Sequence, residues 1–245
     1  KIDCKDFDTA YDEAEYIAHS INSFVRKGVF SYGDSAVLYR TNAQSRLLEE
    51  RFVRENIPYK IVGGVNFYAR KEIKDLLCYL KTIDNAQDDL AVKRIINVPK
   101  RGIGATTIAK VQDYADENGM SFYAALRQAE EISTLSKATA TKIRPFVTFI
   151  QMLRSKLPYI SVEQLMDEII EDTGYVAELD AEGTDEARAR IENIDELISK
   201  IVAYEESVEQ PTLSGFLEEV ALIADIDNLE EDSDYVVLMT LHSAK

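Results

Sequence analysis

The sequence predicts an α/β domain interrupted by a long all-helical insertion, so that the fold class is α/β plus mainly α. Strand and helix patterns alternate between residues 1 and 85, and this order of elements is typical of a parallel α/β sheet. Residues 86–234 show helical periodicity and almost no strand candidate. A β-rich apolar segment returns at residues 235–240. We therefore expect residues 1–85 and 235–245 to form a partial α/β lobe, and residues 86–234 to form a helical subdomain.

The expected α/β lobe alternates between the two periodicities. Residues 8–27 carry apolar side chains at helical spacing, and Ser35–Tyr39 is a short apolar run that follows a Gly-Asp turn signal. A second helix begins at Thr41–Asn42 and ends before Pro58. Residues 59–62 then form a second strand, and residues 71–83 form a third helix. This order favours parallel strands joined by helical crossovers.

The insertion contains a series of amphipathic segments, each with an apolar stripe at helical spacing. Pro145 and Pro158 mark kinks or breaks in this series. The expected helices are residues 108–117, 121–128, 139–156, 161–173, 185–207 and 213–224.

Charge is distributed unevenly along the 245 residues. The formal net charge is −16, but residues 160–234 hold 24 acidic and 3 basic residues, so the rest of the chain carries +5. An acidic chain as a whole disfavours binding to DNA. The asymmetry nevertheless allows a local contact with DNA in the mildly basic part.

Composition excludes several classes of protein. No apolar run approaches the roughly 20 residues that span a bilayer, and nothing is typical of a signal peptide. Cys4 and Cys78 match no metal or redox spacing. The acidic cluster at residues 228–234 is typical of a solvated linker, so no metal site is expected. We expect a cytoplasmic protein with reduced thiols and no membrane partner.

The two ends of the sequence bear on every expectation about function. The chain starts at Lys1 without a methionine, and it stops within an apolar-then-polar pattern at residues 236–245. We expect both ends to be cut points within a longer protein. The incomplete sheet would then have an exposed edge, so we expect a monomer that is able to dimerise through that edge in a crystal.

The first segment with candidate chemistry is residues 37–46. Arg40 stands at the carboxyl end of an expected parallel strand, the edge at which α/β sheets bind ligands. A guanidinium group clamps phosphate bidentately and stabilises the charge of a transferring phosphoryl group. Tyr39 offers a ring to a nucleotide base. The alternative is a surface arginine in a structural ion pair.

This segment resembles motif IV of the UvrD/PcrA/Rep DNA helicases of superfamily 1, and the sequence is most similar to the PcrA group. The resemblance implies that residues 1–85 and 235–245 belong to a partial RecA-like lobe, subdomain 2A, and that residues 86–234 are the helical subdomain 2B. It also implies that Tyr39 packs on adenine and that Arg40 contacts the γ-phosphate in trans. Gln44 of the motif is present and is expected at the nucleotide site.

A second segment, residues 62–75, joins paired glycines to an aromatic and basic cluster. Such a cluster is able to stack on a base and touch phosphates. The stretch is similar to the family's single-strand DNA segment, which implies DNA contacts by Gly64, Phe67, Arg70 and Lys74. Asn66 departs from the pattern, since many relatives have a basic residue there. The alternative is a plain strand-to-helix turn.

A third segment, residues 98–108, contains Gly-Ile-Gly after two basic residues. Five basic residues and no acidic ones lie between residues 90 and 112. Backbone amides at a helix N-terminus bind phosphate. The segment resembles the helix-hairpin-helix element by which subdomain 2B contacts duplex DNA. The alternative is an ordinary turn between helices. The residues that the resemblance assigns to DNA are Lys100, Arg101, Gly102, Gly104 and Thr107.

A fourth segment, residues 240–245, is similar to the start of the family's motif V. The resemblance implies that Thr240 and His242 contact single-stranded DNA, although a lone histidine is ordinarily a structural or surface residue. The acidic residue that completes motif V is absent from the sequence.

The sequence also lacks the parts that hydrolyse ATP. It contains no Gly-x-x-x-x-Gly-Lys-Thr/Ser phosphate loop and no Asp-Glu metal-binding strand. We expect ATP and Mg²⁺ to be cofactors of the whole enzyme, a 3′-to-5′ helicase of DNA repair and replication, while the present chain neither hydrolyses ATP nor binds it tightly.

Two functions therefore remain open. In the first, the chain is part of a DNA motor whose partners are single-stranded DNA and duplex junctions. In the second, it is a regulatory module whose acidic helices dock on proteins such as RNA polymerase or repair proteins, and its contact with DNA is incidental.

Overall fold

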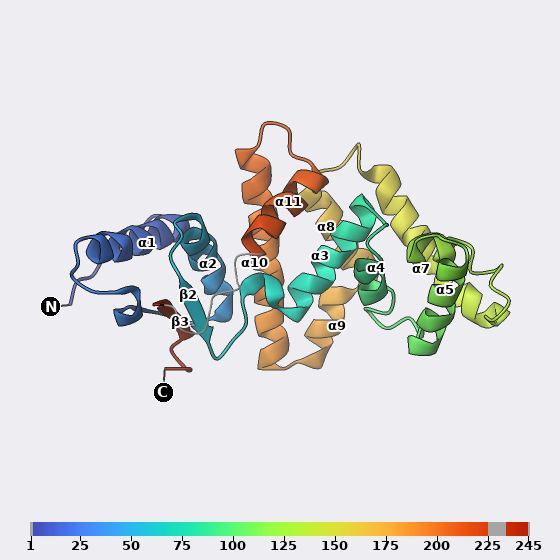
Figure 1. Ribbon diagram of the computed structural model, residues 1–245, viewed down its shortest axis with the longest axis horizontal. Coiled ribbons are helices and arrows are strands. Elements are labelled where there is room, and N and C mark those ends of the chain that lie inside the picture. Colours follow the sequence, from blue (N-terminus) through green and yellow to red (C-terminus); the bar gives the residue numbers. More distant parts are fainter. Residues whose placement is uncertain (1, 225–233, 245) are drawn as a thin grey trace. The chain divides into compact units, whose positions relative to one another are not determined.

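The structure is a computed structural model that describes residues 2–224 and 234–244, and these residues form two compact units (Figure 1). The mixed unit consists of Lys1–Arg70 and Glu219–Lys245, and the helical unit is Lys71–Glu218. The sequence led us to expect divisions at residues 85 and 235, whereas the units are divided after Arg70 and after Glu218. The first division lies earlier because the helix that begins at Lys71 packs among the helices of the second unit.

The mixed unit contains a three-stranded parallel sheet with the order β1-β3-β2. Its strands are β1 (Ala36–Tyr39), β2 (Tyr59–Val62) and β3 (Val236–Thr240). The central strand is the last in sequence, and it pairs Val237 with Ala36 on one side and with Lys60 on the other. Val236 and Leu238 are fully buried, as expected for the middle strand of a sheet.

Two helices of the mixed unit pack against each other, α1 (Ala10–Arg26) and α2 (Ser45–Arg54). α1 begins where the side chain of Thr9 accepts a hydrogen bond from the amide of Asp12, at 3.1 Å. Its buried face is narrow and built from Ala14, Ala18 and Ile21, which permits a close approach of α2.

α3 (Lys71–Asp84) is the central helix of the helical unit. Apolar side chains at positions 73, 76, 77, 80 and 83 recur at helical spacing and are buried. The helix packs against α4 (Asp89–Ile95), α7 (Lys137–Lys156), α8 (Val162–Thr173) and α10 (Asp185–Ser207). This stripe explains why α3 belongs to the helical unit.

The remaining helices of the chain are α5 (Ala105–Glu117), α6 (Phe122–Arg127), α9 (Tyr175–Glu182) and α11 (Leu213–Ala224). Short η helices lie at Tyr32–Asp34, Asn42–Gln44 and Phe67–Ala69. Gly174, in the left-handed region at φ 68°, ends α8 and lets the chain turn directly into α9.

The structure confirms the predicted fold class, a small parallel α/β sheet combined with a large helical part. The helices expected at residues 185–207 and 213–224 have the predicted limits. Two short helices, α4 and α9, were not among the predicted segments. The acidic linker expected at residues 228–234 lies outside the described residues except for Asp234, whose carboxylate accepts hydrogen bonds from the amides of Tyr32 and Gly33.

Candidate functional site

The carboxyl edge of the sheet brings together segments that are far apart in the sequence. β1 and β3 are parallel, so Tyr39 pairs with Thr240. The amide of Leu241 donates to the carbonyl of Tyr39 at 2.8 Å, which holds the two strand ends side by side. His242 follows and is exposed. The candidate nucleotide residues and the candidate single-strand residues at the end of β3 therefore share one edge.

Arg40 is the first residue after β1, and it is exposed. Its amide donates to Oε1 of Gln44 at 2.9 Å, and the same oxygen accepts from the amide of Thr41 at 3.2 Å. Gln44 therefore caps the turn that leads into α2, a role that its Thr-x-x-Gln spacing from Thr41 signals but that was not assigned to it from the sequence. The cap fixes the backbone of Arg40 at the carboxyl edge of the sheet, where the residue is exposed.

Tyr39 is buried, with 7% of its surface exposed. Burial raises the pKa of its phenol, the carboxylate of Glu49 adds to this effect, and Arg70 opposes it. The phenol therefore stays neutral and lies beside the polar interior between β1 and α2. The assignment of this ring to adenine stays a prediction, since the ring has little exposed surface in this arrangement.

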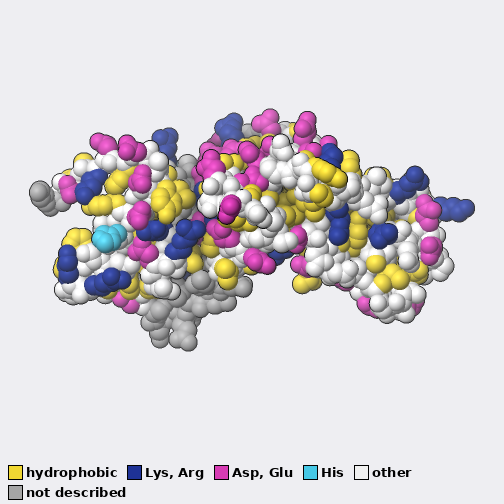
Figure 2. All heavy atoms as spheres, turned by 90° about the horizontal axis from the view of Figure 1, so that it is seen from above, with side chains coloured by type: hydrophobic (Ala, Val, Ile, Leu, Met, Phe, Trp, Pro, Cys, Tyr) yellow, Lys and Arg dark blue, Asp and Glu magenta, His cyan; other side chains and the backbone are white. Residues whose placement is uncertain are grey.

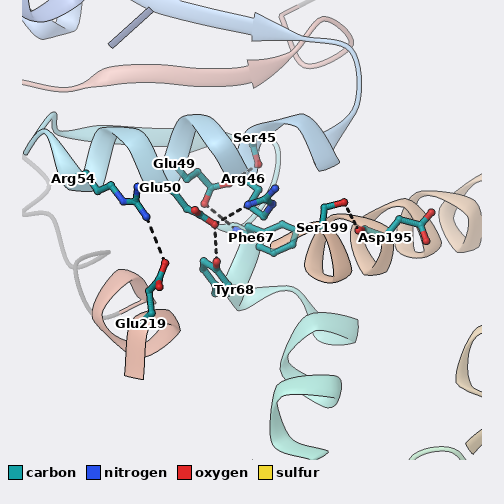
Figure 3. Close-up of polar contacts among 10 residues, drawn as sticks. All are labelled: Ser45, Arg46, Glu49, Glu50, Arg54, Phe67, Tyr68, Asp195, Ser199 and Glu219. Carbon is teal, nitrogen blue, oxygen red and sulfur yellow. Dashed lines mark hydrogen bonds and ion pairs between the residues drawn. The ribbon is translucent and has the colours of Figure 1, made fainter. Parts of the chain in front are cut away.

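A buried polar network joins α2 to the segment that follows the paired glycines (Figure 3). The amide of Phe67 donates to Oε2 of Glu49 at 2.9 Å, and the hydroxyl of Tyr68 donates to Oε1 of Glu50 at 2.7 Å. Glu50 also pairs with Arg46 at 3.1 Å. Because a buried carboxylate is costly unless it is paired, these contacts fix the segment against α2.

Arg70 belongs to the same interior. Its guanidinium group donates to the carbonyl of Asn42 at 3.0 Å and to Oγ of Ser45 at 2.7 Å, and it lies 3.8 Å from Glu49. Its carbon Cζ lies 5.0 Å from the centre of the Phe67 ring, which is fully buried. The described contacts thus give Phe67 and Arg70 structural roles, while their expected contacts with DNA stay a prediction.

The acidic half of this network was not among the candidate residues in the sequence. Arg46 and Glu50 stand four residues apart on one helix, a spacing visible in the sequence. Nothing local distinguishes this pair from a solvated surface pair, however. Its burial depends on residues 67–70 folding back onto α2, and that is a tertiary contact.

The first of the paired glycines is the one that the turn requires. Gly63 has φ 76°, and a Cβ atom built there would lie 2.5 Å from Oγ of Ser243. Gly64, the predicted DNA-contacting residue, has an ordinary φ and room for a Cβ at 3.4 Å from Ile61. Gly63 therefore permits the close approach of residues 240–244, where Oγ of Thr240 lies 3.0 Å from Oγ of Ser243.

In the helical unit, α4 and α5 are joined by residues 96–104, which contain the predicted hairpin. Gly102 has φ 71°, and a Cβ there would lie 3.4 Å from Nζ of Lys142. Gly104 is the N-cap of α5 and has open space around it, while Thr107 lies in the first turn of that helix. The hairpin thus leaves a helix N-terminus accessible, although its assignment as a helix-hairpin-helix stays a prediction.

The two basic residues of the hairpin differ in their surroundings. Lys100 is exposed. Arg101 turns inward, and Nη1 lies within hydrogen-bond distance of four carbonyl groups, at 3.0 to 3.3 Å. Its Nη2 donates to the hydroxyl of Tyr79 at 2.6 Å. Of these two residues, Lys100 is therefore the one that the hairpin presents to solvent. Lys74, on α3, is also exposed.

The described residues are 2–224 and 234–244. Within those ranges, no group of three or more His, Cys, Asp and Glu side chains is arranged to hold a metal ion. None of the described helices combines the length and apolar composition that a membrane span requires.

Comparison with known proteins adds to this geometry. A family model described as the UvrD-like helicase C-terminal domain matches residues 1–245. The chain is 46% identical over 239 residues to the "ATP-dependent DNA helicase PcrA" of Staphylococcus aureus strain NCTC 8325 and to the protein of that name in Staphylococcus epidermidis strain ATCC 12228. The match covers 97% of this chain and 32% of each relative, so the chain spans about a third of their length.

Proposed function

Because the chain belongs to the UvrD-like helicase C-terminal domain family, we propose that it is part of an ATP-dependent DNA helicase. In this proposal the mixed unit is part of the second motor lobe, subdomain 2A, and the helical unit is subdomain 2B. The whole enzyme moves 3′ to 5′ along one strand, and ATP with Mg²⁺ is bound mainly by parts outside this chain.

The observation that carries the proposal is the convergence of segments at the carboxyl edge of the sheet. Arg40 is exposed at that edge with its backbone fixed by Gln44, and Thr240 ends the adjacent strand, which His242 follows. An arginine held in this way is suited to reach a phosphate bound by a facing lobe. The neighbouring strand end is suited to follow a nucleic-acid backbone, so that ATP turnover and DNA movement are coupled across one edge.

The proposed contacts with DNA divide into direct and indirect ones. Lys74, Lys100 and His242 are exposed and suited to direct contact with phosphate. Gly64, Gly102 and Gly104 would contribute through the backbone, and Thr107 through its hydroxyl group, because its amide donates to the carbonyl of Gly104. For Phe67, Arg70 and Arg101 we propose an indirect contribution, by holding these segments in place, because their side chains are engaged inside the protein.

The partners and the location follow from this role. Single-stranded DNA and duplex junctions are the proposed substrates, in repair and replication. We further propose a cytoplasmic location and a monomeric chain.

The role of Arg40 is tested by grafting this chain into Staphylococcus aureus PcrA in place of the matching 239 residues. We expect Arg40→Ala to lower the kcat of DNA-stimulated ATP hydrolysis by roughly 10³-fold, as removal of a phosphate-sensing arginine does elsewhere. Arg40→Lys should recover little, because the ammonium group lacks the bidentate fork. Arg54→Ala removes an exposed arginine from the end of α2 and serves as the control. An unchanged kcat in Arg40→Ala would refute the assignment.

A second candidate function is supported by the charge of residues 160–234, which hold 24 acidic and 3 basic residues. Such a surface suits docking on basic partners, among which RNA polymerase and repair proteins are candidates. Fluorescence anisotropy with a duplex that carries a single-stranded tail separates the two functions. Salt-sensitive binding that Lys100→Ala weakens favours the motor role, and absence of binding at low salt favours the docking role.

A further inference from the structure

A cavity of about 360 Å³ opens between the α3–α4 turn, α6 and α7 in the helical unit. The polar side chains that matter in its lining are two arginines, two glutamines and a tyrosine, namely Arg127, Arg154, Gln87, Gln151 and Tyr123. No carboxylate is among the lining residues. The cavity therefore offers hydrogen-bond donors and two positive charges with no built-in counter-ion.

The two arginines differ from others in the same unit. Arg94 pairs with Asp75 at 2.7 Å, and Arg190 pairs with Glu186 at 2.5 Å. Within residues 2–224 and 234–244, neither Arg127 nor Arg154 has an ion-pair partner, and both are exposed. Since unpaired guanidinium groups beside a cavity bind oxyanions bidentately, the pair favours an anionic ligand.

The backbone under these side chains is well packed. Leu126 and Leu153, their immediate neighbours, are buried in the contact between α6 and α7. The hydroxyl of Tyr123 donates to the carbonyl of Val147 at 3.4 Å. Burial raises the pKa of the Tyr123 phenol, and the positive charges of Arg154 and Arg127 oppose this effect, which indicates that both guanidinium groups lie near the same neutral ring.

The surrounding charge is also positive. Residues 85–159 hold 11 basic and 7 acidic residues, in contrast to the acidic stretch that follows. Figure 2 shows Lys and Arg side chains over the end of the helical unit that contains α5 and α7. A local positive field raises the concentration of a polyanion at this end even though the whole chain is acidic.

The cavity is separate from the hairpin. Gly102 of the hairpin lies beside Lys142, near the start of α7, whereas Gln151 and Arg154 lie near the end of that helix. Twelve residues of α-helix separate Lys142 from Arg154, which corresponds to about 18 Å along the axis. A group bound in the cavity is thus a different one from any that the hairpin contacts.

We propose that this cavity is a second phosphate-binding site of the helical unit, in which the guanidinium groups of Arg127 and Arg154 clamp a backbone phosphate of bound DNA. The amide groups of Gln87 and Gln151 complete the set of donors. The inference rests on the proposed function, because it takes DNA as the source of the phosphate. Free inorganic phosphate offers the same chemistry and is the other source.

The test measures the anisotropy of a labelled 20-base-pair duplex with a single-stranded tail against the 245-residue chain. We expect Arg127→Ala/Arg154→Ala to weaken binding by about tenfold and to reduce the slope of log K against log salt by about 1, the value for one phosphate contact. The matched control is Lys137→Ala/Arg144→Ala, which removes the same charge from exposed positions on α7 outside the cavity and should have a small effect. Arg127→Lys/Arg154→Lys keeps the charge without the bidentate fork and should fall between.

The outcomes separate the site from the proposed function. If Lys100→Ala weakens binding but the cavity variant matches its control, the second site is refuted and the hairpin contact stands. If the wild-type chain does not bind the DNA at low salt, the second site and the hairpin contact are both refuted. Inorganic phosphate, added at constant ionic strength, should compete with DNA more strongly in the wild type than in the cavity variant, which keeps the phosphate contacts of the hairpin. Equal competition in both would refute phosphate binding at this cavity.

Discussion

Lys100 and Arg101 are neighbours in the chain, but their side chains have different physical roles. Lys100 is solvated, whereas Arg101 is within reach of four carbonyl groups at the end of α4 and of the hydroxyl of Tyr79. Three of those carbonyl groups, Ile96, Val98 and Pro99, follow the last residue of α4. The carbonyl of Ile95 also accepts from the amide of Val98 and that of Val98 from the hydroxyl of Tyr79, whereas those of Ile96 and Pro99 have Arg101 as their donor among the described contacts. The planar guanidinium group reaches several of them at once, which an ammonium group does not.

At this scale we predict that Arg101→Ala lowers the free energy of unfolding by about 2–4 kcal/mol, since hydrogen bonds to a charged group are lost and carbonyl groups are left unsatisfied. Urea unfolding followed by circular dichroism measures the change. Lys100→Ala should change the same quantity by less than about 0.5 kcal/mol. Equal effects of the two substitutions would contradict the structural role of Arg101.

At the scale of elements, α7 shows how packing overrides a local signal. Pro145 was expected to mark a kink or a break, and the structure shows no break, because the helix runs through it from Lys137 to Lys156. The turns on both sides of Pro145 are anchored by Ile143, Phe146 and Ile150, which are buried. Burial of this face stabilises the helix by more than the proline costs, which is about 3 kcal/mol in a helix interior.

We accordingly predict that Pro145→Ala raises the free energy of unfolding by about 1–3 kcal/mol, because it restores a backbone donor and removes a steric clash with the preceding turn. Thermal or urea unfolding checks this value. Arg144→Ala, at the adjacent exposed position, should have little effect. A loss of stability in Pro145→Ala would mean that the ring itself makes a necessary contact.

At the scale of the whole molecule, buried tyrosines make the free energy of unfolding depend on pH in the alkaline range. Burial raises the pKa of the phenols of Tyr39, Tyr68, Tyr79, Tyr123 and Tyr175 above the ordinary value. In Tyr68 and Tyr175 a neighbouring carboxylate adds to the effect of burial. The folded chain therefore keeps protons that the unfolded chain releases at about pH 10.

This contribution to stability is fully present below about pH 10, and it is lost as the pH rises from there toward the raised pKa values of the folded state. We predict that the free energy of unfolding falls steeply between about pH 10 and pH 12. Tyr175→Phe should reduce that fall, because it removes one of the groups that cause it, although it also loses the hydrogen bond to Asp75 at 2.8 Å. Stability that is constant over this range would contradict the prediction.

The sequence by itself determined the succession of elements and the candidate positions. Helical periodicity located α10 and α11 at their limits, and the β-rich segment at the end of the chain located β3. Arg40 was placed correctly after a strand for the same reason. These features depend on residues close together in the chain, where side-chain period and turn chemistry decide the local structure.

Only the tertiary structure decided which side chains face solvent. α3 belongs to the helical unit because its stripe finds partners among distant helices. Phe67, Arg70 and Arg101 were predicted as contact residues, but they are engaged inside the protein because segments far away in the chain supply their partners. Exposure depends on what packs over a residue, and no local pattern contains that information.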